Sequence, residues 1–204
     1  MGVLEYIKNE RVAFNENKNG SCVSFGEFIM KKVNTKKLVL TALFAALIFV
    51  TTTFIRIPLP LGYVNLGDAF VFLSVFILGP LYGTVAAGSG SALADLFGYI
   101  AYAPGTLVIK TAMALVAACL NKLLLQATNK PLIAEIVAGI AGAVIMAFGY
   151  FFYEILFFSS VSVAIVNVPW NLVQGSVGIV VATLVMRILG ATKVLQTLED
   201  KKDL

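Results

Sequence analysis

Residues 64–110 read VNLGDAFVFLSVFILGPLYGTVAAGSGSALADLFGYIAYAPGTLVIK, an apolar stretch interrupted at Gly79-Pro80 and again at Pro104-Gly105. Glycine and proline in such pairs indicate turns. A helix needs about 20 apolar residues to cross the hydrocarbon core of a bilayer. The pieces on either side of Gly79-Pro80 therefore predict two short transmembrane helices, or one broken unit.

The rest of the chain extends this pattern. Of the 204 residues, 59% are hydrophobic and 13% charged, whereas soluble domains carry about 25% charged residues. Apolar runs predict spans over 38–54, 66–78, a third ending near 99, a fourth ending near 125, 132–158 and 168–189. We therefore predict an all-α polytopic membrane protein, with about six transmembrane helices in one compact bundle.

Polar segments flank the membrane domain. Residues 1–29 form a polar N-terminal extension that is either disordered or the product of a mis-assigned start, because Met30-Lys31-Lys32 resembles a natural beginning. Residues 30–192 form the six-helix domain, and 193–204 a charged tail. The first segment is not a signal peptide, since it has no apolar stretch before a cleavage site.

Several function classes are excluded by composition. The chain has no histidine, the commonest general base and metal ligand, and its two cysteines predict neither a disulfide framework nor a metal site. It carries no phosphate-binding glycine loop of the G-x-x-x-x-G-K-[ST] type. We expect no enzyme activity, no cofactor and no bound metal. The net charge of +4 fits a membrane orientation signal better than a nucleic-acid surface.

Lysine and arginine predict the orientation in the cell membrane. With both termini in the cytoplasm, nearly all basic residues fall on the inner side, and only Arg56 is left in a short outer loop. This satisfies the positive-inside rule. The orientation places the intramembrane polar residues in the outer half of the bundle, and we predict that they line a binding site there: Asp68, Asp95, Lys110, Glu154, Asn167, Asn171 and Gln174.

Each of these residues has a second interpretation. Charges in a bilayer persist when they pair, face a watery cavity or serve a ligand, so Asp95 and Lys110 either touch a ligand or form a structural ion pair. The i, i+4, i+7 spacing of Asn167, Asn171 and Gln174 puts them on one helical face, where amides also bond neighbouring helices. Tyr63, Tyr99, Tyr102 and Trp170 are expected around the mouth of the site.

Small residues mark the first span. Ala42 and Ala46 form a small-x-x-x-small pair, which permits close approach of another helix. That helix belongs either to the same chain or to another membrane protein.

These features resemble the substrate-binding (S) component of energy-coupling factor (ECF) vitamin transporters. The Asn-Leu-Gly-Asp run, the Gly-Pro-Leu-Tyr-Gly turn and Ala-Asp-Leu within residues 64–110 are similar to its riboflavin-type and hydroxymethylpyrimidine/pyridoxine-type branch. The resemblance covers residues 30–189. It implies an outward-loading vitamin-binding subunit that associates, through Ala42 and Ala46, with a transmembrane coupling subunit and two cytoplasmic ATPases.

The resemblance does not decide the vitamin. A pocket of amides, one lysine and carboxylates suits pyridoxine or hydroxymethylpyrimidine first, then riboflavin, which needs more aromatic stacking, and then pantothenate, which favours an uncompensated Lys110. The alternative is a stand-alone secondary transporter of a small polar metabolite. Such proteins have inverted repeats and midplane sites, and we find no convincing repeat.

Overall fold

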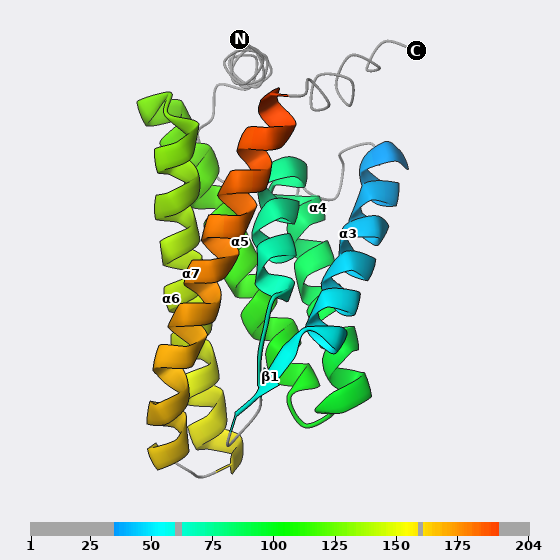
Figure 1. The fold of residues 1–204 in the computed structure, drawn as a ribbon, viewed down its shortest axis with the longest axis vertical. Coiled ribbons are helices and arrows are strands. Elements are labelled where there is room, and N and C mark those ends of the chain that lie inside the picture. The colour runs from blue at the N-terminus through cyan, green and yellow to red at the C-terminus, as the bar shows by residue number, and fades with distance from the viewer. Residues whose placement is uncertain (1–34, 60–62, 159–160, 192–204) are drawn as a thin grey trace, which may run out of the picture.

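The computed structural model describes residues 35–59, 63–158 and 161–191. It contains five long helices and two short strands (Figure 1): α3 (Thr35–Phe54), β1 (Arg56–Pro58), β2 (Tyr63–Asn65), α4 (Gly67–Gly98), α5 (Ala103–Thr128), α6 (Pro131–Phe158) and α7 (Val161–Ala191). Each helix is long and apolar enough to cross a membrane. The predicted all-α membrane fold is confirmed, whereas the predicted segments 1–29 and 193–204 lie outside the described residues.

Helix α4 reverses its direction at Gly79. This glycine has φ 78° and ψ −171°, a conformation that residues with a Cβ avoid. Ser74 Oγ, nine positions before Gly83, donates a hydrogen bond to the Gly83 carbonyl at 3.2 Å. In a straight helix nine residues span about 13.5 Å. The second and third predicted spans are therefore two antiparallel halves of one broken helix.

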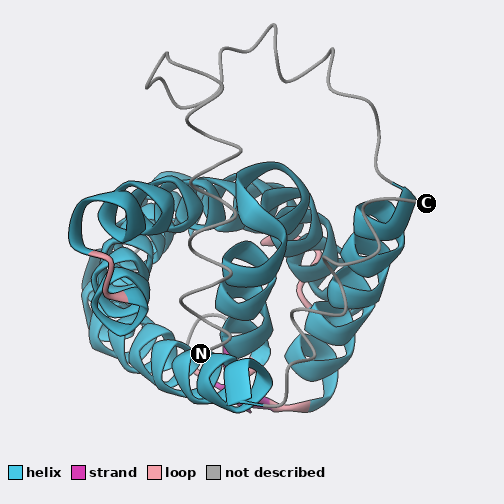
Figure 2. Cartoon of the chain, turned by 90° about the horizontal axis from the view of Figure 1, so that it is seen from above, coloured by secondary structure: helices cyan, strands magenta, loops and turns pink. Residues whose placement is uncertain are grey.

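The first half of α4 is the centre of the bundle. Almost every residue from Gly67 to Leu78 is buried, and the end-on view in Figure 2 shows helices surrounding an inner one. The second half approaches it closely, because a Cβ on Gly83 would lie 2.6 Å from the Cα of Val75. Glycine at this position is what allows the two halves to pack side by side.

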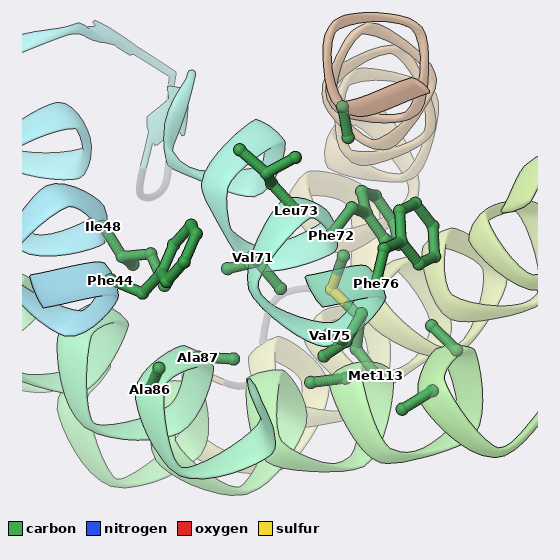
Figure 3. Close-up of a cluster of buried hydrophobic side chains, with 14 of the residues drawn as sticks. Phe44, Ile48, Val71, Phe72, Leu73, Val75, Phe76, Ala86, Ala87 and Met113 are labelled. Atoms are coloured by element: carbon green, nitrogen blue, oxygen red, sulfur yellow. The ribbon is translucent and has the colours of Figure 1, made fainter. Parts of the chain in front are cut away.

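Apolar side chains fill the interior and also cover the outside. Phe44 and Ile48 point from α3 toward Val71 of α4 (Figure 3), and all three are buried. Leu184 on α7 is 58% exposed, and many other large apolar side chains share this exposure. An apolar exterior of this extent marks a membrane-facing surface.

The two strands define one end of the bundle. β1 and β2 pair antiparallel, with Ile57 opposite Val64, and we call this the hairpin end (Figure 1).

Two helices begin earlier here than predicted. Pro104 lies in the first turn of α5, where a missing N–H costs nothing, and α7 begins at Val161, so that Asn167 lies in its second turn.

Candidate binding pocket at the hairpin end

A pocket opens among the helices at the hairpin end, with a volume of about 450 Å³ that includes its open part. Residues from α3 to α7 and from the strand β2 contribute to it. The lining consists of Thr52, Leu59, Tyr63, Asn65, Ser91, Asp95, Tyr102, Thr106, Lys110, Tyr150, Glu154, Asn167, Asn171 and Gln174. Six of the seven predicted site residues are in this lining. The seventh, Asp68, is buried and bonded to two of them.

Lys110 forms an ion pair with Asp68, and both side chains are almost fully buried. Of the two alternatives that the sequence left open for Asp95 and Lys110, the structure does not form the ion pair between these two residues. Asp95 is hydrogen-bonded instead to Tyr63. The Lys110–Asp68 pair is neutral as a unit, which lets it persist in a bilayer, and the charge of Lys110 is already compensated.

Asp95 accepts a hydrogen bond from the hydroxyl of Tyr63, which reaches it from β2. Burial, followed by the nearby Asp95 carboxylate, raises the pKa of the Tyr63 phenol well above its usual value. Tyr63 therefore stays protonated and serves as a donor. The guanidinium of Arg56 lies 5.7 Å from the Tyr63 ring and 5.6 Å from the Tyr99 ring. This cation–π contact fixes the aromatic side of the mouth.

Glu154 of α6 also lines the pocket. Its Oε1 accepts hydrogen bonds from Tyr102 at 3.3 Å and from Asn167 at 3.0 Å. Its Oε2 is buried and has no hydrogen-bond partner in the described part of the chain. An unsatisfied buried carboxylate oxygen costs free energy, so this atom is suited to accept a hydrogen bond from a ligand.

The three amides of α7 differ in their engagement. The Gln174 Oε1 accepts the Asn65 N–H at 2.7 Å, and its Nε2 donates to Asp68 at 2.6 Å. Asn167 bonds Glu154. The Asn171 side chain has no hydrogen-bond partner among residues 35–59, 63–158 and 161–191, although it is only 7% exposed and lines the pocket. Asn171 is the amide that remains available to a ligand.

Several lining residues were not predicted from the sequence. Thr106 lies four positions before Lys110, and Tyr150 four before Glu154; their hydroxyls share a hydrogen bond of 3.0 Å. Residues at i and i+4 share a helical face, so this spacing was the available signal. Of the expected aromatic residues, Tyr63 and Tyr102 line the pocket, whereas Trp170 is 47% exposed.

The small residues of α3 face away from the bundle. Ala42 and Ala46 are exposed, while Thr41, Phe44 and Ile48 on the opposite side of the helix are buried. Packing within the chain therefore does not explain the alanine pair. That they contact a coupling subunit stays a prediction.

The fold and the pocket define a helical membrane protein with a polar cavity at one end. A family model described as the S component of the ECF-type riboflavin transporter matches residues 32–191. The chain belongs to this family of transporter subunits, and the resemblance seen in the sequence is confirmed.

Two further similarities accompany this match. A protein of Pyrococcus woesei, described only as an uncharacterized protein in a gap 3' region, is 40% identical over 103 residues; the match spans 50% of this chain and 66% of that protein. The structure of the S component of a bacterial ECF transporter superposes with a TM-score of 0.55 and 20% identity, covering 78% of this chain and 97% of the other. This structure supports the shared fold.

Proposed function

We propose that this chain is the vitamin-capture subunit of an ECF-type importer and that riboflavin is its ligand. The observation that carries the proposal is the pocket, which combines three tyrosines with an available amide and an unsatisfied carboxylate oxygen. A polar cavity with a few convergent hydrogen-bonding groups is the usual form of a small-molecule site.

Riboflavin moves ahead of the other candidates for structural reasons. Tyr63, Tyr102 and Tyr150 line the pocket, and aromatic rings of this kind stack on a flat heterocycle. The description of the matching family names riboflavin as well. Pyridoxine and hydroxymethylpyrimidine follow, because a smaller ring needs fewer aromatic partners.

Pantothenate remains last. A ligand carboxylate in a buried site needs a positive charge beside it. The charge of Lys110 is neutralised by its ion pair with Asp68, and Asp95 and Glu154 add two carboxylates to the pocket lining. The charge balance of the pocket therefore disfavours an anionic ligand such as pantothenate.

The remaining parts of the proposal are orientation and partners. The positive-inside distribution of lysine supports a pocket that opens to the outside of the cell, with both termini in the cytoplasm. The exposed face around Ala42 and Ala46 supports contact with a transmembrane coupling subunit. Two cytoplasmic ATPases would supply the energy, since the sequence has no P-loop motif.

The test is to purify the chain in detergent and identify its retained ligand by mass spectrometry. Titration with riboflavin should quench flavin fluorescence at one ligand per chain. Cells with this chain alone should not accumulate riboflavin, and cells that also hold a coupling subunit and ATPases should. Retention of pyridoxine with no flavin binding would refute riboflavin as the ligand, and uptake by the chain alone would refute the subunit role.

A further inference from the structure

A continuous set of polar contacts joins α5, α4 and α7 to the strand β2 at the hairpin end. Lys110 of α5 donates to one oxygen of Asp68 in α4. Gln174 of α7 donates to the other oxygen of Asp68 at 2.6 Å and accepts the backbone N–H of Asn65 in β2 at 2.7 Å. We call these residues the Lys110–Asp68–Gln174 network.

Asn65 extends the network to α3 and adds a second contact with α4. Its side-chain Oδ1 accepts the N–H of Gly67 at 2.8 Å, at the start of α4. The same oxygen accepts the hydroxyl of Thr52, from α3, at 3.3 Å. The position of β2 relative to α3, α4 and α7 is therefore set by hydrogen bonds that meet at Asn65.

The amide of Gln174 is fully used within the protein. Its oxygen and nitrogen each have a partner, and the side chain is 7% exposed. Asn171, three positions earlier on the same helix and in the same lining, has no hydrogen-bond partner within the described part of the chain. The two amides on this face of α7 therefore have different roles: Gln174 bonds other residues of the protein, and Asn171 is available to a ligand.

We propose that Gln174 is a positioning residue that ties β2 to the Lys110–Asp68 ion pair, and that it acts on ligand affinity through the strand rather than by direct contact. β2 contributes Tyr63 and Asn65 to the pocket, so its position sets one wall. The ion pair fixes the Asp68 carboxylate, the carboxylate orients the Gln174 amide, and the amide holds the Asn65 N–H.

Hydrogen exchange tests the strand contact without any ligand. In Gln174→Leu both hydrogen bonds are lost at nearly constant volume, and the Asn65 amide should exchange about fivefold faster or more. Asn171→Leu is the matched control, one turn away on the same helix, and should leave exchange in β2 unchanged. Exchange in β2 that stays at the wild-type rate in Gln174→Leu would overturn the proposal.

A reciprocal swap provides the second test, in which Asp68→Asn is combined with Gln174→Glu. In the double variant Lys110 donates to the oxygen of the new amide, the nitrogen of that amide donates to the new carboxylate, and the carboxylate accepts the Asn65 N–H. All three bonds and the net charge are kept. Gln174→Glu alone places two carboxylates together. The single change should speed exchange in β2, and the swap should restore it; a swap that fails to restore protection contradicts the network.

Ligand kinetics form a readout that rests on the proposed function. Riboflavin should dissociate faster from Gln174→Leu and at near the wild-type rate from the swap. If wild-type protein binds no flavin, the proposed ligand fails while exchange in β2 still decides the role of Gln174. If flavin binds and dissociates equally fast from wild-type and Gln174→Leu, the link from the strand to affinity fails.

Discussion

Asn167 donates a hydrogen bond to Glu154 at 3.0 Å and so joins α7 to α6 beside the pocket. The same carboxylate oxygen accepts the Tyr102 hydroxyl. One buried oxygen therefore satisfies donors from two other parts of the chain. The consequences of removing it differ with the replacement.

Glu154→Leu should lower the free energy of unfolding by about 1–3 kcal/mol, since it removes the buried oxygen that accepts two hydrogen bonds. Glu154→Gln keeps an oxygen acceptor and should lose less. Thermal unfolding in detergent without ligand measures both. Leu156→Ala, on an exposed part of α6, is the control. A Glu154→Leu variant as stable as this control would contradict the bonding role.

Asn171→Ala should weaken riboflavin binding about tenfold or more. The loss of one hydrogen bond to the ligand costs about 1.4 kcal/mol, and this free energy corresponds to a factor of ten in Kd. The melting temperature without ligand should stay at the wild-type value, since the amide has no partner to lose among the described residues. Fluorescence titration measures the affinity, and Leu172→Ala is the neighbouring control. Unchanged affinity would remove Asn171 from the site.

The sequence predicted the helices well because their signal is local. Apolar runs marked the membrane spans, and Gly79-Pro80 marked the reversal inside α4. The start of α7 was predicted seven residues late. Its first turns are rich in β-branched residues, which have low helix propensity, and Pro169 follows them. Helix packing outweighs both signals.

The residues of the site were easier to predict than their partners. Burial of charge in a membrane is conspicuous in a sequence, and it indicated Lys110 and both aspartates. Which aspartate pairs with Lys110 depends on the register between α4 and α5, which no local pattern encodes. The different roles of Asn171 and Gln174 could not be predicted from a local pattern either. They depend on the position of β2, whose Asn65 N–H bonds Gln174 and leaves Asn171 available to a ligand.

Gly83→Ala should destabilise the fold by about 1–3 kcal/mol, as overpacking in a tight interior does. Its new Cβ would lie 2.6 Å from the backbone of Val75, which cannot rotate away as a side chain does. Thermal unfolding is the measurement, and Val85→Ala on the exposed face of the same helix is the control. A Gly83→Ala variant with wild-type stability would argue against the close approach within α4.

A second ion pair joins α6 and α7 far from the pocket. Arg187 donates to Glu135 at 2.5 Å, and the Glu135 side chain is 4% exposed. Arg187→Met should lower stability by about 1–3 kcal/mol, because it leaves a buried carboxylate without its donor. Arg187→Met with Glu135→Gln should recover part of the loss. Equal stability of the single and double variants would show that the charges are not coupled.

Ala42→Leu with Ala46→Leu should reduce co-purification of a coupling subunit and leave riboflavin affinity unchanged. Both alanines are exposed, and larger side chains would hold a partner helix away. Ile140→Phe, on the exposed side of α6, is the control for a general surface effect. Complex formation at the wild-type level would exclude this face as the contact.

The reversal at Gly79 also determines the direction in which α5, α6 and α7 cross the membrane. Five straight crossings would leave Thr35 and Ala191 on opposite sides of the membrane, whereas the returning half of α4 makes the number of crossings even. Figure 1 shows the start of α3 and the end of α7 at the same end. Without the turn, α5, α6 and α7 would be inverted, and Lys110, Glu154 and Asn171 would be carried away from Asp68. A single left-handed glycine therefore keeps the two halves of the pocket on one side of the bilayer.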